Sequence, residues 1–193
     1  TTNNRKLYLL AREYHDHGHM LNENLPRGRD RHRIYGFNYR MTEIQAVIAK
    51  VQLEKLDYIV EKNRKNYSII ESKLLEIKGL KLRKIPSKCK PLCDTLIIQF
   101  DSKNTANKFV EKLQRKGFST KNVPDAIEWH FAKYWGHMLK EIEVTLKNLQ
   151  SNLKRTSDII ECCVALPIMV KPNFYQMNQQ SNDIKKIVIE SIK

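Results

Sequence analysis

A long helix is the feature that most constrains what this chain can fold into. From Thr42 onward, small or apolar residues, with one asparagine and one tyrosine among them, recur at alternating spacings of three and four: Ala46, Ala49, Leu53, Leu56, Val60, Asn63, Tyr67, Ile70, Leu74 and Ile77. This period predicts one long helix that ends near Gly79. Thr42 and Gln45 match the S/T-x-x-E/Q pattern of a capping box, so the helix should begin there.

The first turns of this predicted helix carry a second apolar line, formed by Ile44, Val47, Ile48 and Val51. Both faces should therefore be buried at its start. The small side chains of Ala46 and Ala49 would also let a neighbouring backbone approach closely. We expect the helix to begin inside a protein mass and to emerge half-exposed, as a helix that links two domains would.

The segment before this helix is predicted to be a short helix followed by a long loop. Residues 3–17 have an apolar face and a stop at Gly18, whereas residues 19–40 contain few aliphatic side chains. Loops longer than about 15 residues in compact proteins are usually functional or disordered. Three aromatic residues near the end of this loop favour an ordered one: Tyr35, Phe37 and Tyr39.

After Gly79 the pattern changes to that of a small α/β layer domain. "LKLRKI" and "DTLIIQF" are typical of strands, "NTANKFVEKLQRKG" of a helix capped by Asn104 and ended by Gly117, and "FSTKNV" of a short strand. Residues 139–161 are expected to be helical. The chain closes with a buried strand, "CCVALPIMV", and an amphipathic helix that turns four side chains inward: Ile184, Ile187, Val188 and Ile192.

The formal net charge of +14 raises nucleic acid and membrane surfaces as partners. Most lysines are scattered beside acidic residues, which is typical of a solvated basic face. The exception is "RGRDRHR", Arg27 to Arg33, because the rigid fork of arginine suits phosphates and carboxylates. No RRM or KH signature accompanies it, so a basic nucleic-acid-binding module is a remote alternative. No apolar run approaches the ~18 residues of a membrane span, and no membrane partner is expected.

Common catalytic and metal-binding motifs are absent. There is no G-x-S-x-G, P-loop, G-x-G-x-x-G or H-E-x-x-H. The cysteines form no C-x2-C pair, and the histidines that alternate around Gly18 do not converge, so no metal site is predicted. Reduced cysteines in a cytosolic protein are the expected state.

The junction between the loop and the long helix is the best candidate site. Asn38 and Arg40 lie just ahead of the helix N-terminus, whose free N–H groups and positive dipole end favour an anion. An amide donor and a guanidinium beside them would complete a site for a phosphate or a carboxylate. The alternative is that Asn38 is a turn residue and Arg40 a surface charge.

The same residues carry a resemblance to a known family. "GFNYRMTEIQAVIAKVQLEKLD" resembles the signature of the DegT/DnrJ/StrS family of pyridoxal-phosphate-dependent sugar aminotransferases, from which it departs mainly at Val47 and Ala49. That signature reads G-[YFW]-N-[YS]-R-[ML]-[ST]-E-[IL]-Q-A-A-I and then Q-L-x-K-L-D. The opening "TTNNRKLYLLAREYHDHG" resembles the family segment after its G-E-G-G turn, and "VALPIMV" with the terminal helix resembles its closing strand and helix. The resemblance thus covers the whole chain, as the C-terminal half of a longer enzyme.

This resemblance implies an α/β fold, the C-terminal half of a fold type I, aspartate-aminotransferase-like transferase. Residues 1–50 would be the tail of the large domain with a dimer-interface loop, residues 51–79 a linking helix, and residues 80–193 a small C-terminal α/β domain. The family's Schiff-base lysine would precede Thr1. This chain is therefore expected to contain no catalytic residue of that kind and not to catalyse transamination alone.

The resemblance also assigns binding residues. Asn38 would reach across a homodimer interface to the phosphate of pyridoxal 5'-phosphate in the neighbouring subunit, and Arg40, with Tyr39 beside it, would contact the substrate. Trp129 and His130 are implied as further substrate contacts. Their segment, "TKNVPDAIEWHFAKYWGHM", resembles a subgroup that aminates an oxidised octulosonic acid.

The implied activity is transfer of an amino group from a donor, with glutamate expected, to a keto- or aldehydo-sugar or a nucleotide sugar. It would serve lipopolysaccharide, other cell-surface polysaccharide or related amino-sugar biosynthesis in the cytoplasm. The alternative is a non-catalytic remnant or a split-gene half that only dimerises. A reading frame upstream of Thr1 that encodes a lysine and then G-E-G-G would distinguish the two.

Overall fold

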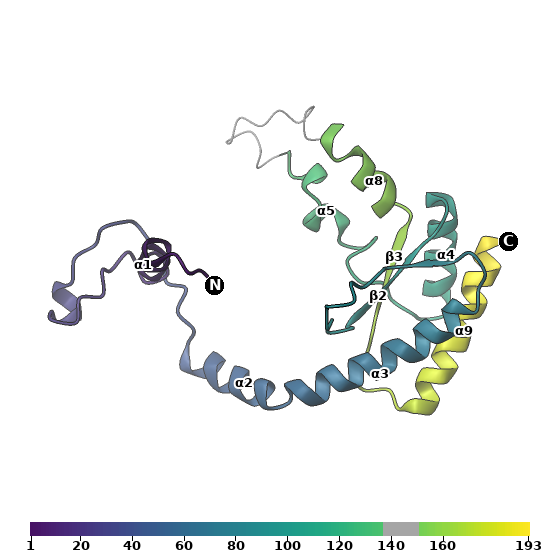
Figure 1. Cartoon of the computed structure of the whole chain (residues 1–193), viewed down its shortest axis with the longest axis horizontal. Helices are drawn as coiled ribbons and strands as arrows, with labels where there is room; N and C mark the ends of the chain where they lie inside the picture. Colours follow the sequence, from purple (N-terminus) through teal and green to yellow (C-terminus); the bar gives the residue numbers. More distant parts are fainter. Residues whose placement is uncertain (137–150) are drawn as a thin grey trace. The chain divides into compact units, whose positions relative to one another are not determined.

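The computed structural model describes residues 1–136 and 151–193 of the chain (Figure 1). The chain divides into two compact units, Thr1–Lys55 and Leu56–Lys193. The domain limits expected at residues 50 and 79 stay a prediction. Of the helix predicted over residues 139–161, the part up to residue 150 lies outside the described residues.

The first unit begins with α1 (Arg5–Tyr14), which is shorter at both ends than the helix expected over residues 3–17. The Asn4 side chain caps it by accepting hydrogen bonds from the backbone N–H groups of Lys6 and Leu7 at 3.0 and 3.2 Å. Beyond the helix the chain turns at His17 and Gly18, whose φ angles are 56° and 84°. The helix therefore ends at Tyr14, before the stop predicted at Gly18, and Gly18 belongs to the turn that follows.

The loop predicted over residues 19–40 is ordered and folds back on the end of α1; it contains the short helical turn η1 (Arg27–Arg29). The backbone N–H of His17 donates to the carbonyl oxygen of Phe37 at 3.1 Å, and that of Tyr39 donates to His15 at 2.9 Å. The two segments therefore run antiparallel. Gly36 permits this approach, because a Cβ atom there would lie 2.5 Å from the carbonyl oxygen of Tyr14.

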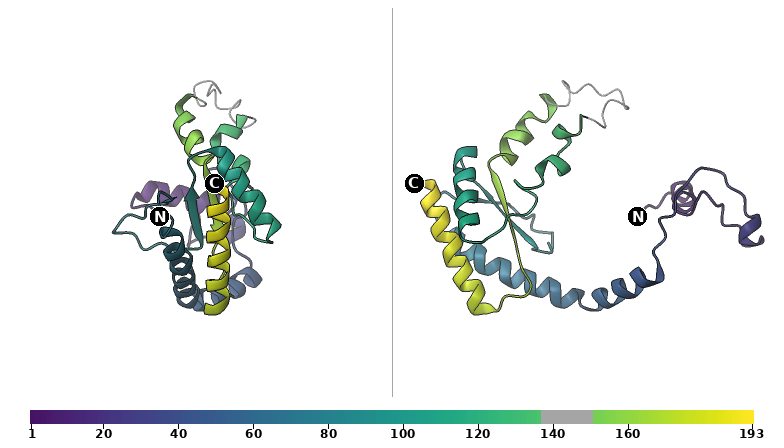
Figure 2. Two further views of the ribbon diagram at one scale, coloured as in Figure 1. Left: turned by 90° about the vertical axis from the view of Figure 1, so that its right-hand side faces the viewer. Right: turned by 180° about the vertical axis from the view of Figure 1, so that it is seen from behind.

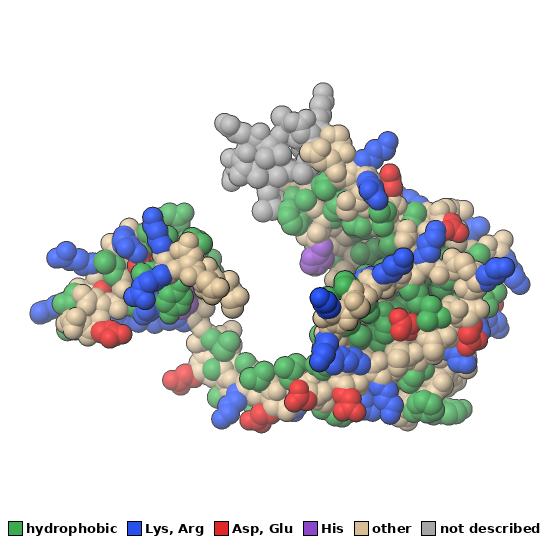
Figure 3. Space-filling view, in the orientation of Figure 1, with side chains coloured by type: hydrophobic (Ala, Val, Ile, Leu, Met, Phe, Trp, Pro, Cys, Tyr) green, Lys and Arg blue, Asp and Glu red, His purple; other side chains and the backbone are tan. Residues whose placement is uncertain are grey.

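α2 (Glu43–Glu54) begins at the predicted capping box. Thr42 Oγ1 accepts a hydrogen bond from the backbone N–H of Gln45 at 3.3 Å, and Gln45 Oε1 accepts one from that of Thr42 at 2.9 Å. The burial expected on both faces of its first turns is wrong for this chain. Every residue of α2 is described and none is buried, so its apolar side chains gather on the surface (Figure 3).

The single helix predicted from Thr42 to Gly79 is interrupted at Lys55, between α2 and α3 (Leu56–Leu75). The backbone N–H of Lys55 donates to the carbonyl oxygen of Gln52 at 3.1 Å, so the last turn of α2 closes with a tighter i→i−3 bond. Lys55 is neither glycine nor proline, and its residue type gives no signal of a break. The apolar period continues across it, which is why the sequence pattern predicts one helix.

A three-stranded antiparallel sheet with the strand order β1-β2-β3 forms the centre of the second unit. β1 (Lys81–Leu82) pairs with β2 (Thr95–Gln99), and β2 pairs with β3 (Cys163–Pro167), in a register that sets Leu96 opposite Leu166. Leu96 and Ile98 of β2 are buried while their neighbours are only partly covered, as the two-residue period of a strand requires. Three predicted strands are thus confirmed.

Three long helices pack with this sheet: α3, α4 (Lys103–Arg115) and α9 (Phe174–Ile192). α9 lies beside both α3 and α4 (Figure 2). Their facing side chains build the core together with those of the sheet: Tyr67, Ile70, Leu74, Ala106, Phe109, Leu113, Met177, Ile184, Ile187 and Val188. The predicted stripe is therefore confirmed in α3 from Asn63 onward, whereas Leu56 at its start is 45% exposed. Ile192, expected to point inward, is 49% exposed because it is the last residue of α9.

Two local predictions for the second unit are wrong. α4 is capped by Ser102, whose hydroxyl accepts a hydrogen bond from the backbone N–H of Thr105 at 3.1 Å, and not by Asn104. "FSTKNV" is not a strand, because the chain makes a tight turn at Asn122, with a φ of 63° and a 2.7 Å bond from the N–H of Val123 to the carbonyl of Lys121.

Among its described residues the second unit also has shorter helices: α5 (Ile127–His130), η2 (Ala132–Tyr134) and α8 (Lys154–Ile160). Lys133 Nζ joins η2 to α8 through Ser157 Oγ at 2.7 Å and Glu161 Oε1 at 3.2 Å. Within residues 1–136 and 151–193, no helix is both long and apolar enough to cross a membrane.

Candidate functional site

Two buried carboxylates mark the C-terminal end of α1. The side chains of Glu13 and Asp16 are only 5% and 3% exposed. A negative charge at this end of a helix is opposed by the helix dipole, and a buried carboxylate without a partner costs several kcal/mol. Both groups therefore need cations, and arginines from the loop supply them.

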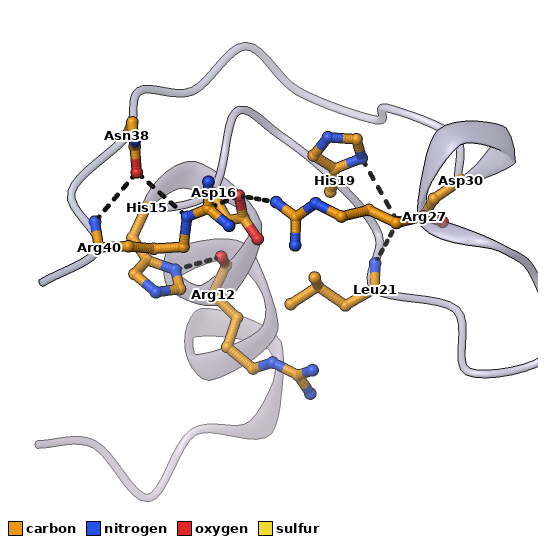
Figure 4. A network of polar contacts seen from close by, with 9 residues as sticks. All are labelled: Arg12, His15, Asp16, His19, Leu21, Arg27, Asp30, Asn38 and Arg40. Atoms are coloured by element: carbon orange, nitrogen blue, oxygen red, sulfur yellow. Dashed lines mark hydrogen bonds and ion pairs between the residues drawn. The ribbon is translucent and has the colours of Figure 1, made fainter. Parts of the chain in front are cut away.

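Arg33 binds Glu13 with two parallel hydrogen bonds, from Nε to Oε2 at 3.1 Å and from Nη2 to Oε1 at 2.6 Å. Arg27 Nη2 donates to Asp16 Oδ1 at 2.6 Å (Figure 4). The "RGRDRHR" segment, predicted to meet anionic ligands, thus uses two of its four arginines to bind carboxylates of this same chain. The sequence signal for these pairs is the presence of two acids where the helix dipole disfavours them.

Asp30 holds the base of the loop. Its carboxylate accepts hydrogen bonds from the backbone N–H groups of Leu21 at 2.7 Å and Arg31 at 3.0 Å, and His19 Nδ1 lies 3.6 Å away. Burial works to raise the pKa of this carboxyl, but the backbone hydrogen bonds outweigh it and lower the pKa. Asp30 is therefore ionised at neutral pH and fixed to the backbone.

Asn38 and Arg40 contact each other directly (Figure 4). The side-chain oxygen of Asn38 accepts hydrogen bonds from the backbone N–H of Arg40 at 3.3 Å and from its Nε at 3.1 Å. Both neighbours can only donate, so the oxygen must face Arg40. The Nδ2 amide, with its two N–H donors, then points away from Arg40.

Asp16 connects Asn38 and Arg40 to Arg27 on the other side of the loop. Arg40 Nε lies 3.3 Å from Asp16 Oδ1, the same oxygen that binds Arg27. Burial would raise the pKa of Asp16, but the hydrogen bond and charge of Arg27, with the charge of Arg40, lower it. Two guanidinium groups therefore share one carboxylate, and this trio keeps a net charge of about +1 at neutral pH.

Tyr39 is 64% exposed and belongs to an aromatic cluster. Its ring centroid lies 6.1 Å from that of Tyr14 and 5.7 Å from that of Phe37, and Tyr35 contacts Tyr14 at 5.9 Å. Burial, followed by the charges of Tyr39 and Tyr35, raises the pKa of the Tyr14 hydroxyl. The Tyr14 hydroxyl is therefore uncharged at neutral pH.

Trp129 and His130 belong to the second unit, in α5. Trp129 is 78% exposed, and its carbonyl oxygen accepts a hydrogen bond from Trp135 Nε1 at 3.1 Å. The structure therefore brings Asn38, Tyr39 and Arg40 together in one unit and holds Trp129 and His130 in the other. All five assignments as binding residues stay predictions. Among the described residues, His, Cys, Asp and Glu side chains form no group of three suited to a metal ion.

The sequence and the fold both match known aminotransferases. A model of the DegT/DnrJ/EryC1/StrS aminotransferase family matches residues 1–184. Helicobacter pylori PseC, an aminotransferase involved in the biosynthesis of pseudoaminic acid, is 15% identical with a TM-score of 0.69, over 98% of this chain and 48% of that one. Two further solved structures are similar in the same way.

The sugar aminotransferase CalS13 from Micromonospora echinospora is 18% identical with a TM-score of 0.70, over 95% of this chain and 45% of that one. An aminotransferase from Psychrobacter cryohalolentis is 18% identical with a TM-score of 0.73, over 100% of this chain and 51% of that one. The chain thus spans about half the length of these solved relatives, and the expected α/β fold, the C-terminal half of a pyridoxal-phosphate-dependent transferase, is confirmed. The chain belongs to the DegT/DnrJ/EryC1/StrS aminotransferase family.

Proposed function

We propose that this chain is part of a sugar aminotransferase in which Asn38 binds the phosphate of pyridoxal 5'-phosphate held in the neighbouring subunit of a homodimer. The enzyme would move an amino group from a donor, glutamate, to a keto- or aldehydo-sugar. Membership of a family of pyridoxal-phosphate-dependent aminotransferases supports the class of reaction. The observation that carries the residue assignment is the geometry of the Asn38 amide.

The residues at this site fit a phosphate. Because Arg40 occupies the side-chain oxygen of Asn38, the amide presents only N–H donors to a ligand, and phosphate oxygens only accept. The surplus positive charge that Arg27 and Arg40 keep around Asp16 lies in the same network. A phosphate requires both hydrogen-bond donors and positive charge. The negative charge of Asp16, which would repel it, is already neutralised by Arg27 and Arg40.

The bound cofactor would supply the electron sink and carry the amino group between donor and acceptor. The chain's own residues would position the reactants: Asn38 through its amide donors, Arg40 through its remaining guanidinium N–H groups against an anion or hydroxyl of the sugar, and Tyr39 through its exposed ring. Trp129 and His130 are proposed as further contacts to the sugar. The sugar class we favour is an oxidised octulosonic acid, whose carboxylate would suit a guanidinium. Its aminated product would serve cell-surface polysaccharide biosynthesis.

The test is Asn38→Ala in the enzyme that contains this chain together with the lysine-bearing half. Loss of a charge-assisted hydrogen bond should weaken pyridoxal phosphate affinity about tenfold to 100-fold, measured by absorbance titration. Asn24→Ala, in an exposed part of the same loop, is the matched control and should leave the affinity unchanged. Equal affinities of Asn38→Ala and the unmodified enzyme would refute the assignment.

The wider claim has its own test. The gene should encode, in the same frame or in a neighbouring one, a segment with a lysine followed by G-E-G-G. If it does not, this gene product is a non-catalytic dimerising remnant. Assay of the complete enzyme with a panel of keto- and aldehydo-sugars, following conversion of glutamate, would then identify the acceptor and test the donor.

A further inference from the structure

The orientation of the Asn38 side chain depends on more than its own sequence position. Asn38 is exposed, and an exposed amide can rotate unless both its ends are engaged. Here the only described contacts of its oxygen are the two hydrogen bonds from Arg40. Whatever fixes the Arg40 guanidinium therefore also fixes the direction of the Asn38 N–H donors.

Asp16 is the group that fixes it. Its carboxylate is buried, and Arg40 Nε lies 3.3 Å from Oδ1 in an ion pair while the same nitrogen donates its hydrogen bond to Asn38 Oδ1. Arg27, in a different part of the loop, donates from Nη2 to the same Asp16 oxygen at 2.6 Å. The acid cannot move without losing a second ion pair, which makes it a firm support for Arg40.

The backbone holds Asp16 and Asn38 opposite each other. The two residues form an antiparallel bridge, and hydrogen bonds from His17 N–H to Phe37 and from Tyr39 N–H to His15 lie on either side of it. The distance between the two side chains is therefore set by main-chain pairing and not by a flexible connection. A short acid at position 16 can reach Arg40 only because of this pairing.

We infer that Asp16 is a positioning residue: it holds Arg40 against the oxygen of Asn38 and thereby turns the Asn38 amide N–H groups toward a bound phosphate. This inference rests on the proposed role of Asn38 in cofactor binding. It assigns to Asp16 no contact with the ligand. Its effect on affinity must pass entirely through Arg40 and Asn38.

The first test needs no cofactor. In the isotopically labelled 193-residue chain, the side-chain 15N resonance of Asn38, assigned by its loss in Asn38→Ala, should show restricted motion. Asp16→Asn keeps the size of the side chain but weakens the hold on Arg40, so the Asn38 amide should become mobile while the backbone signals of His17, Phe37 and Tyr39 stay in place. Unchanged mobility of the amide would overturn the inference.

A second variant separates positioning from general loop stability. Arg40→Met removes the link between Asp16 and Asn38 but leaves the Arg27–Asp16 anchor, so it should free the Asn38 amide as Asp16→Asn does. Arg27→Met removes the anchor and leaves the link, and should free the amide less. If Arg27→Met had the larger effect, Asp16 would act only as a loop anchor. Arg40→Met also replaces Asp16→Asn if that variant does not fold.

The third test is a double-mutant cycle in the complete enzyme, with pyridoxal phosphate affinity as the readout. Asp16→Asn should weaken affinity about fivefold to tenfold when Asn38 is present and have no effect in the Asn38→Ala background. Equal effects in both backgrounds would overturn the inference. If Asn38→Ala itself changes nothing, the proposed function fails, whereas the mobility measurement still decides whether Asp16 orders the amide.

Discussion

The two units of this molecule bury opposite kinds of side chain. Every buried hydrophobic side chain among the described residues lies in Leu56–Lys193, where α3, α4, α9 and the sheet share one core. In Thr1–Lys55, all of which is described, the buried residues are Glu13, Asp16 and Gly18. One unit is stabilised by removal of apolar surface from water, and the other by ion pairs and backbone hydrogen bonds around one turn.

The contrast continues on the surface. Large apolar side chains of Thr1–Lys55 are exposed, with Ile44 at 75% and Tyr35 at 81%. Apolar surface gathered in this way is unusual on a monomeric protein and is typical of a surface that meets other protein. This agrees with a chain that spans about half the length of its solved relatives. The ion pairs of Glu13 and Asp16 hold the loop against α1, so the fold of this unit does not depend on burial of its apolar side chains.

The largest expected effect comes from the hydrophobic core. Phe109 has no exposed surface, and its ring lies 5.1 Å from that of Phe100. Phe109→Ala should lower the free energy of unfolding of Leu56–Lys193 by about 3–5 kcal/mol, because a large cavity replaces the ring. Urea unfolding followed by tryptophan fluorescence measures this unit alone, since both tryptophans, Trp129 and Trp135, lie in it.

Tyr175→Ala, at a position that is 76% exposed, is the control for Phe109→Ala and should change stability by less than about 0.5 kcal/mol. A loss below 1 kcal/mol for Phe109→Ala would contradict the assignment of the core. If that variant does not fold, Phe109→Leu provides a smaller change in the same direction.

An intermediate effect is expected where the first unit turns. Gly18 has a φ of 84°, and a Cβ atom there would lie 1.8 Å from the carbonyl oxygen of Ile34. Gly18→Ala should therefore make opening of the loop easier by about 1–3 kcal/mol. Faster amide hydrogen exchange at Phe37 and Tyr39 would measure this, with an unchanged tryptophan-monitored unfolding of the second unit.

Gly28→Ala in the same loop is the matched control, because a Cβ atom there meets no other atom within 4 Å. Its amide exchange should equal that of the unmodified chain. Similar exchange in the two variants would mean that the close approach of the loop to the end of α1 does not exist in solution.

The smallest effect is expected on α2. Ile48 is 58% exposed, so Ile48→Ala should change the free energy of unfolding of this chain by less than about 0.5 kcal/mol. Ile98→Ala makes the same chemical change at a buried position of β2 and should cost about 2–5 kcal/mol. A cost above 1 kcal/mol for Ile48→Ala, measured by circular dichroism, would show that this face of α2 is covered in solution.

Local chemistry and periodicity predicted much of the fold. The capping box at Thr42 and Gln45, the buried faces of α3 and α9 and the three strands all follow from patterns within a few residues, which the sequence displays directly. The interruption at Lys55 and the turn at Asn122 could not be predicted in this way. Neither residue is a glycine or proline, so neither residue type indicates a break. The residues on either side of Asn122 also form hydrogen bonds with Ala165 of β3, which is distant in the sequence.

The candidate site was predictable only in part. Asn38 and Arg40 were indicated by their place before a helix, but their link to Asp16 joins positions 22 and 24 residues apart through main-chain pairing. The arginines of "RGRDRHR" have a charge pattern that suits a ligand or a partner carboxylate equally well. Only the fold shows that Asp16 binds Arg27 and that Glu13 binds Arg33.

The antiparallel pairing at the base of the loop also separates a fixed stem from an exposed tip. Bonds from Met20 N–H to Arg31 and from Arg33 N–H to Gly18 close the stem, while residues 22–26 beyond it are exposed. Insertions or deletions in that tip would leave the stem, and hence the position of Asn38, unchanged. Changes confined to residues 22–26 should therefore leave the proposed site at Asn38 in place.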